Sequence, residues 1–149
     1  MKWTAQLGLI SGLLCAGCAE VAPVPPSPTY QPALSAAAEA TLKARCGEVN
    51  NAPGDPNTWR DLGATYLADQ YYQAAITCFE EVVRLAPDDG RGWLLLGVAL
   101  EQAEQIEQAT EAYVRAHEAK QTCAAGAWRA ALLHLDAGAP QLAAELANA

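Results

Sequence analysis

A period of 34 residues constrains the fold of this chain more than any other feature. When the sequence is laid on itself with that shift, Trp59 falls on Trp93 and Phe79 falls on Tyr113. The other matches are Leu62 with Leu96, Gly63 with Gly97 and Ala75 with Ala109. A period of roughly 20 to 50 residues is typical of stacked structural units, because one unit alone cannot bury its apolar face. The chain is therefore expected to fold as a stack of repeats.

The spacing inside each unit predicts helices. The positions i, i+3, i+4 and i+7, which share one face of a helix, carry Trp59, Leu62, Gly63 and Tyr66. Aromatic residues make up only 7% of the chain and alanine is abundant, which favours helices over a sheet. Asp55 followed by proline is a good helix start, because the carboxylate caps free amides and proline fits the first turn.

The same residues carry a family resemblance. The segment 59–66 reads Trp-x2-Leu-Gly-x2-Tyr, and Ala75, Phe79 and Pro87 follow at fixed distances. This pattern resembles that of the tetratricopeptide-repeat family. The resemblance implies an all-α fold, an α-solenoid of antiparallel helix pairs with about two full repeats plus partial flanking repeats. The expected units are a leading helix in 33–55, repeat 1 at 56–89, repeat 2 at 90–123 and a partial repeat 3 at 124–149.

The start of the chain is typical of an exported protein. Lys2 precedes an apolar run, 7–15, that is too short to span a bilayer and fits a signal peptide. The residues Cys15-Ala16-Gly17-Cys18 resemble the lipobox of bacterial lipoproteins. That resemblance implies that residues 1–17 are a lipoprotein signal peptide and that Cys18 is lipidated. The alternative is an ordinary signal peptide cut after Ala19.

Residues 18–32 are expected to be a proline-rich tether. Five prolines fall within ten residues, at Pro23, Pro25, Pro26, Pro28 and Pro32. Proline fixes φ and removes a backbone donor, so the stretch is expected to be an extended spacer. Ala19 rather than Asp follows the lipobox cysteine, and by resemblance to the enteric sorting rule this implies an outer-membrane lipoprotein facing the periplasm. A secreted or periplasmic protein is the alternative.

The family resemblance also implies a binding surface. In tetratricopeptide repeats the first helices line a concave groove for an extended peptide or a helix. Carried onto matching positions, the groove residues are Arg60, Ala64, Leu67, Arg91, Leu94, Leu95, Val98, Trp128, Arg129 and Leu132. Ala64 and Leu95 stand where a carboxylate clamp needs asparagine, so that specificity is not expected. Leu94, Leu95 and Val98 lie on a helix whose other face is already apolar, so the groove is expected to be apolar. Its edges are expected to carry Arg60, Arg91 and Arg129. The alternative is that the N-terminal helix or another copy of the chain covers it.

The sequence offers little for chemistry. His117 and His134 fall in different helices, and no phosphate loop, catalytic or metal-binding motif is present. No enzyme, cofactor or metal is therefore expected. Cys46 and Cys78 take near-equivalent places in neighbouring second helices, which suggests a disulfide in an oxidising compartment. The alternative is that they are small buried packing residues.

These features together predict a non-catalytic adaptor or scaffold for protein–protein interaction in the bacterial envelope. It would dock a protein partner in its groove and assist assembly of a pilus, a secretion machine or an outer-membrane machine. The net charge of −8 disfavours nucleic acid and anionic lipid, so membrane contact would come only through the lipid anchor. The alternatives are a self-associating scaffold, a homo-oligomer, or a soluble periplasmic interaction protein.

Overall fold

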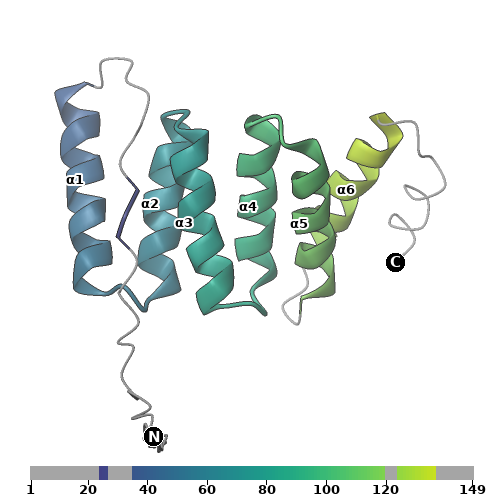
Figure 1. Ribbon diagram of the computed structural model, residues 1–149, viewed down its shortest axis with the longest axis horizontal. Coiled ribbons are helices and arrows are strands. Elements are labelled where there is room, and N and C mark those ends of the chain that lie inside the picture. The colour runs from purple at the N-terminus through teal and green to yellow at the C-terminus, as the bar shows by residue number, and fades with distance from the viewer. Residues whose placement is uncertain (1–23, 27–34, 120–123, 137–149) are drawn as a thin grey trace, which may run out of the picture.

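The computed structural model describes residues 24–26, 35–119 and 124–136 of the chain. Its helices stand side by side in chain order, from α1 to α6 (Figure 1). They are α1 (Ala36–Asn51), α2 (Pro56–Ala68), α3 (Tyr72–Leu85), α4 (Gly90–Gln102), α5 (Ile106–Glu118) and α6 (Ala124–Asp136). The expected all-α solenoid is confirmed.

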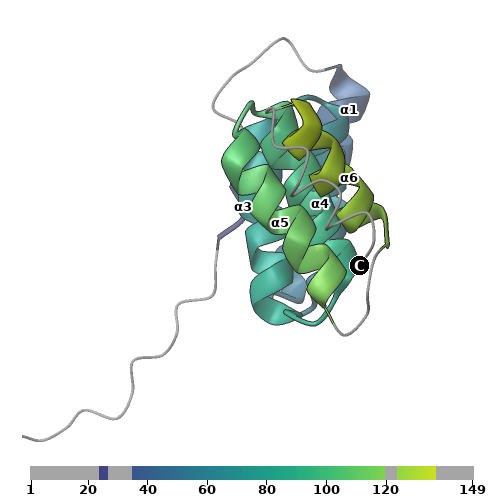
Figure 2. The same cartoon turned by 90° about the vertical axis from the view of Figure 1, so that its right-hand side faces the viewer.

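The helices form two layers. The most extensive packing joins α2 to α3 and α4 to α5, the two helices of each repeat, and α6 packs on α5. Figure 2 shows α3 and α5 on one face and α4 and α6 on the other. We call the side of α2, α4 and α6 the first-helix face and the side of α3 and α5 the second-helix face. No helix in the described part is long and apolar enough to cross a bilayer.

Equivalent tryptophans lie in equivalent surroundings. The indole nitrogen of Trp59 donates to the carbonyl of Pro53 at 2.9 Å, and that of Trp93 donates to the carbonyl of Pro87 at 2.9 Å. Each bond ties the first helix of a repeat to the end of the preceding helix. The 34-residue period is therefore a period of structure as well as of sequence.

The turns repeat in the same way. Asp55 and Asp89 cap α2 and α4, each accepting a hydrogen bond from a backbone amide two residues on. Gln70 and Glu104, also 34 residues apart, have φ of 65° and 61° in the turn between the two helices of a repeat. Such a φ is uncommon outside glycine, so the shared conformation marks a shared turn.

The core runs along the stack rather than into one centre. Its largest fully buried side chains are Trp59, Tyr66, Tyr113, Phe79, Leu62 and Val49. Gly63 brings α2 close to α3 because Phe79 lies over it, and Gly97 does the same for α4 with Tyr113. Each described helix pair is thus closed by one glycine beneath one aromatic ring.

Candidate partner-binding face

The structure divides the predicted groove residues into two regions of different chemistry. Ala64 lies in a hollow of about 440 Å³ between α1 and α2. Small or polar side chains line this hollow. They are Ala38, Thr41, Arg45, Asp61, Ala64, Thr65, Ala68 and Asp69.

The apolar region lies on α4 and α6. On α4 the side chains of Leu94, Leu95 and Val98 are half-buried and pack on the core. On α6 Trp128 is 62% exposed and Leu132 is 37% exposed. These two lie four residues apart, so they share one side of the helix. Leu67 on α2 is half-buried against the core in the same way as the α4 residues.

The exposure of Trp128 follows from its place in the repeat. Trp59 and Trp93 stand at the fourth position of their repeats, whereas Trp128 stands at the fifth position of repeat 3. One residue along a helix turns a side chain by about 100°. The indole therefore leaves the core position and faces solvent.

Two of the three predicted groove arginines are held by acidic partners. Arg60 pairs with Asp89 at 2.7 Å, and its other terminal nitrogen donates to Asn57 at 2.8 Å. Arg91 is exposed and forms no ion pair with any described residue. Arg91 is thus the predicted groove cation that is left available to a ligand carboxylate.

Arg129 belongs to a three-residue cluster. It donates to both carboxylate oxygens of Glu101, at 2.8 and 2.7 Å, and its guanidinium lies 5.9 Å from the centre of the Tyr113 ring. Tyr113 donates its hydroxyl hydrogen to the same carboxylate at 2.6 Å. Burial, followed by the hydrogen bond to Glu101, raises the pKa of Tyr113 to about 12. The cluster joins α4, α5 and α6 and satisfies the charge of Glu101 within the protein.

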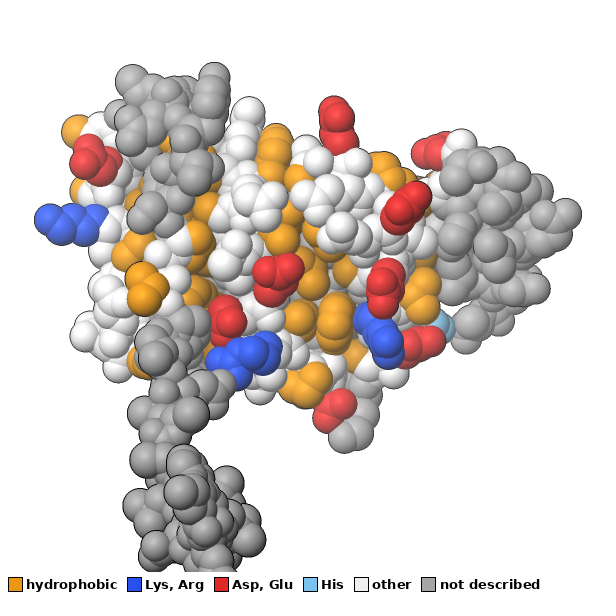
Figure 3. All heavy atoms as spheres, in the orientation of Figure 1, with side chains coloured by type: hydrophobic (Ala, Val, Ile, Leu, Met, Phe, Trp, Pro, Cys, Tyr) orange, Lys and Arg blue, Asp and Glu red, His pale blue; other side chains and the backbone are white. Residues whose placement is uncertain are grey.

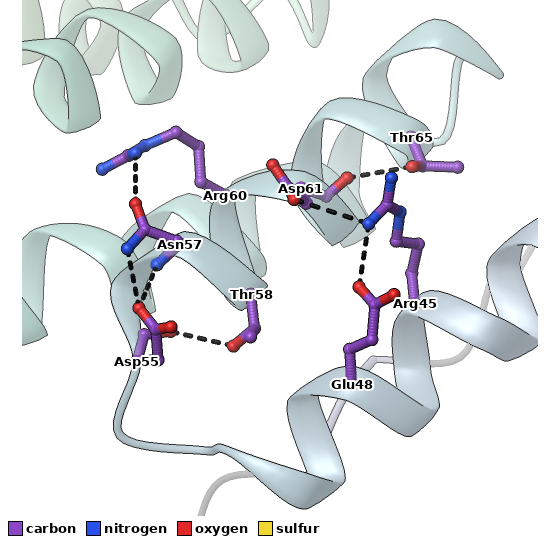
Figure 4. A network of polar contacts seen from close by, with 8 residues as sticks. All are labelled: Arg45, Glu48, Asp55, Asn57, Thr58, Arg60, Asp61 and Thr65. Atoms are coloured by element: carbon purple, nitrogen blue, oxygen red, sulfur yellow. Dashed lines mark hydrogen bonds and ion pairs between the residues drawn. The ribbon is translucent and has the colours of Figure 1, made fainter.

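A second polar network crosses from α1 to α2 (Figure 4). Arg45 donates to Glu48 at 2.8 Å and reaches Asp61 at 3.5 Å. The hydrogen bonds to Glu48 are the main cause of a raised pKa at Arg45. These charges therefore neutralise one another across the contact between α1 and α2.

The second-helix face carries a different distribution of charged side chains. Figure 3 shows charged side chains of both signs interspersed among apolar ones on the side seen in Figure 1. There Glu81 pairs with Arg84 on α3, and Glu118 pairs with Arg115 on α5. Interspersed exposed pairs are the usual surface of a soluble protein, and apolar side chains lie between them on this face (Figure 3).

The predicted disulfide is absent from the structure, which contains Cys46 and Cys78 as free thiols. The helix that packs on α1 is α2, and the Tyr66 hydroxyl of α2 lies 3.9 Å from the Cys46 sulfur. Cys78 is fully buried, and this burial raises its thiol pKa to about 12.

Several predicted features lie outside the described residues. They are the signal peptide, Cys18 and most of the tether, and the second helix of the third repeat. Within residues 24–26, 35–119 and 124–136 no cluster of three or more His, Cys, Asp or Glu could hold a metal ion. His117 is half-buried, with a buried ring nitrogen that has no hydrogen-bond partner.

Sequence reasoning missed the acidic partners and one long-range contact. Asp89 and Glu101 are needed to explain the two paired arginines, and the Tyr66 hydroxyl donates to the carbonyl of Pro26 at 2.5 Å. Asp89 could have been identified only as a helix cap. Nothing in the repeat pattern indicates Pro26, because it precedes the repeats.

Comparison with known proteins places this geometry in context. The family model described as tetratricopeptide repeat matches residues 56–99. The peroxisomal targeting signal receptor of Eremothecium gossypii is 31% identical over 91 residues, which are 61% of this chain and 16% of that receptor. The receptor of the same name from Candida albicans is 32% identical over 73 residues, 49% of this chain and 12% of the receptor. The chain therefore spans less than a fifth of the length of these relatives.

Solved structures show the same fold. A crystal structure of MamA superposes with a TM-score of 0.66 at 21% identity, covering 73% of this chain and 64% of that one. MamA from Desulfovibrio magneticus RS-1 gives a TM-score of 0.64 at 24% identity, covering 74% and 62%. At these identities the likeness concerns the arrangement of helices.

Proposed function

Because the chain carries tetratricopeptide repeats, we propose that it is a non-catalytic adaptor that binds a helix or extended peptide on its first-helix face. The observation that carries this proposal is the exposure of Trp128 and Leu132 on α6, a helix that also contacts α4, where Leu94 and Leu95 are half-buried. Burying a tryptophan and a leucine contributes about 1.5–3 kcal/mol for each large side chain. Such aromatic anchors dominate many protein interfaces.

The pairing of the groove arginines also supports binding of a partner through apolar side chains. Arg60 and Arg129 are already paired with Asp89 and Glu101, so binding would rest on apolar burial, with Arg91 as the cation left for an acidic group on the ligand. The relatives named as targeting signal receptors are consistent with recognition of a short segment of another protein. Since they share only a small part of their length with this chain, their signal is not assigned to it.

We further propose that the adaptor is a lipoprotein of the bacterial outer membrane, anchored at Cys18 and facing the periplasm. The support is the Leu14-Cys15-Ala16-Gly17-Cys18 segment after an apolar run. In that location the protein would assist assembly of a pilus, a secretion machine or another outer-membrane machine. Membrane fractionation of wild type and Cys18→Ala tests the anchor, because the variant should move from the membrane to the soluble fraction.

The binding surface has a separate test. Trp128→Ala/Leu132→Ala is compared with Ile106→Ala, which removes a hydrophobic side chain of similar exposure on α5. Partners captured from envelope extracts by the wild type should be lost by the double variant and kept by the control. Equal capture by all three proteins would contradict the proposed face.

A self-associating scaffold is the second candidate, favoured by the same exposed Trp128. Size-exclusion chromatography with light scattering separates the two ideas. A monomer that captures a distinct protein through Trp128 supports the adaptor. A stable oligomer that dissociates in the Trp128→Ala/Leu132→Ala variant, but persists in Ile106→Ala, supports the scaffold.

A further inference from the structure

Tyr66 joins the repeats to a segment that lies 40 residues earlier in the chain. Its side chain is only 1% exposed, and its hydroxyl donates to the carbonyl of Pro26 at 2.5 Å. The sulfur of Cys46, on α1, lies 3.9 Å from the same hydroxyl oxygen. The Tyr66 hydroxyl is therefore the point where α1, α2 and residues 24–26 meet.

The segment follows a defined path at this point. Figure 1 shows residues 24–26 between α1 and α2, and Figure 2 shows them towards the side on which α3 and α5 lie. Pro25 and Pro26 are half-buried, whereas Val24 is 79% exposed. Within residues 24–26, contact with the domain is thus made by the two prolines rather than by Val24.

The chemistry of the contact suits a proline-rich chain. Proline has no backbone N–H, so an extended run of prolines offers carbonyl acceptors but few donors. Domains that bind such chains combine aromatic rings with polar side chains. Tyr66 provides both, and Tyr71 packs edge-on against it with ring centres 6.2 Å apart. The hydroxyl of Tyr71 is buried and has no hydrogen-bond partner among the described residues, so it is a donor that the described part of the chain leaves unused.

We propose that Tyr66 and Tyr71 form a binding site for an extended proline-rich chain and that residues 24–26 of the same molecule occupy it. The occupant is covalently attached to the domain. Attachment through a short flexible linker gives an effective concentration of the order of millimolar. A contact with a dissociation constant of the order of millimolar can therefore persist within one molecule.

The site has a consequence for orientation, which rests on the proposed anchor at Cys18. Only residues 18–24 would then be free, so the tether would reach about 20 Å instead of about 45 Å at about 3.1 Å per residue. The tether would also join the domain on its second-helix face. The first-helix face, with Trp128, would accordingly be directed away from the membrane.

The NMR test uses a protein that begins at Ala19. This truncation removes no residue of the described core, which extends from Leu42 to Ala130. Carbon-detected NMR relaxation measures the order of Val24, Pro25 and Pro26 against that of residues 19–21. Residues 24–26 should have order parameters near those of the helices, about 0.85, and residues 19–21 values below about 0.6. Equal mobility of the two segments in the wild type would overturn the proposal.

Two variants locate the site. Tyr66→Phe removes the donor and keeps the ring, so residues 24–26 should become as mobile as residues 19–21. Tyr72→Phe is the matched control, because Tyr72 is a half-buried neighbour with no hydroxyl hydrogen bond among the described residues, and it should change nothing. If Tyr66→Phe and Tyr72→Phe both leave the order of residues 24–26 at the wild-type value, the site is not at Tyr66.

A third variant tests the occupant without touching the core. Pro25→Ser/Pro26→Ser should empty the site, so that a synthetic peptide of residues 22–28 binds it saturably, at least tenfold more tightly than it binds the wild type. Equal binding to both proteins would contradict occupancy by the molecule's own segment. None of these measurements depends on lipidation. The Cys18→Ala fractionation tests the anchor and the NMR and peptide experiments test the tyrosine site, so each proposal can fail separately.

Discussion

The ring of Tyr113 occupies the space that a side chain on Gly97 would need. A Cβ added at Gly97 would lie 2.5 Å from Tyr113 Cδ1. We expect Gly97→Ala to lower the free energy of unfolding by about 1–3 kcal/mol, because overpacking must displace the ring. This cost exceeds the gain of up to about 1 kcal/mol in helix propensity. Urea unfolding followed by circular dichroism measures the difference.

Gly47 provides the matched control, because it lies inside α1 and a Cβ added there meets nothing within 4 Å. Gly47→Ala should raise the free energy of unfolding by about 0.5–1 kcal/mol. If the Gly97 variant gains stability like the Gly47 variant, the close approach of α4 and α5 is not as described.

The tryptophans should separate stability from binding. Trp59 is fully buried and hydrogen-bonded, so Trp59→Ala should cost about 3–5 kcal/mol of stability. Trp128 is mostly exposed, so Trp128→Ala should change stability by no more than about 0.5 kcal/mol. Thermal and urea unfolding of the two variants test this directly. A large loss of stability in the Trp128 variant would show that its indole is part of the core and not of a binding face.

The Glu101 cluster should contribute measurable but modest stability. Glu101→Gln removes the charge that faces Arg129, and both side chains are partly exposed. We expect a loss of about 1 kcal/mol, reduced at high salt because ions screen the pair. Glu118→Gln is the control, since its 3.8 Å pair with Arg115 is more than half exposed, and it should have almost no effect. The free energy of unfolding of both variants is measured in low and in high salt. Equal losses of stability in the two variants would contradict a stabilising role for the Glu101 cluster.

Alkaline pH should destabilise the repeats. Burial raises the pKa of Cys78 from 9.0 to about 12 and that of Tyr113 from 10.0 to about 12. In both cases the folded state binds the proton more tightly than the unfolded state, so the stabilisation is complete below about pH 9. It should be lost progressively as the pH rises to about 12. Unfolding midpoints measured from pH 8 to pH 12 test the window, and Cys78→Ser should flatten the first part of the decline.

The repeat fold could be predicted because its determinants are local and periodic. Trp59 and Trp93, or Gly63 and Gly97, report the same packing twice, so position in the sequence specifies position in the helix pair. The exposure of Trp128 follows from the same argument. A period of 34 residues therefore carries most of the information about the backbone.

The parts that could not be predicted depend on contacts between side chains far apart in the chain. Arg60 meets Asp89 across 29 residues and Arg129 meets Glu101 across 28. Those pairings depend on side-chain rotamers and on the twist between repeats, which the repeat pattern does not encode. The contact of Tyr66 with Pro26 involves a segment outside the period, and the distance between Cys46 and Cys78 depends on how α1 sits against α2.

The one-place offset of Trp128 has a wider implication for how such stacks acquire ligands. In a helix, inserting or deleting one residue ahead of a conserved side chain rotates it by more than a quarter turn. A side chain that secures one repeat can thereby become a recognition element in the next, with no change of amino acid. A one-residue insertion or deletion inside α6, ahead of Trp128, would then change which side chain faces the core as effectively as a substitution.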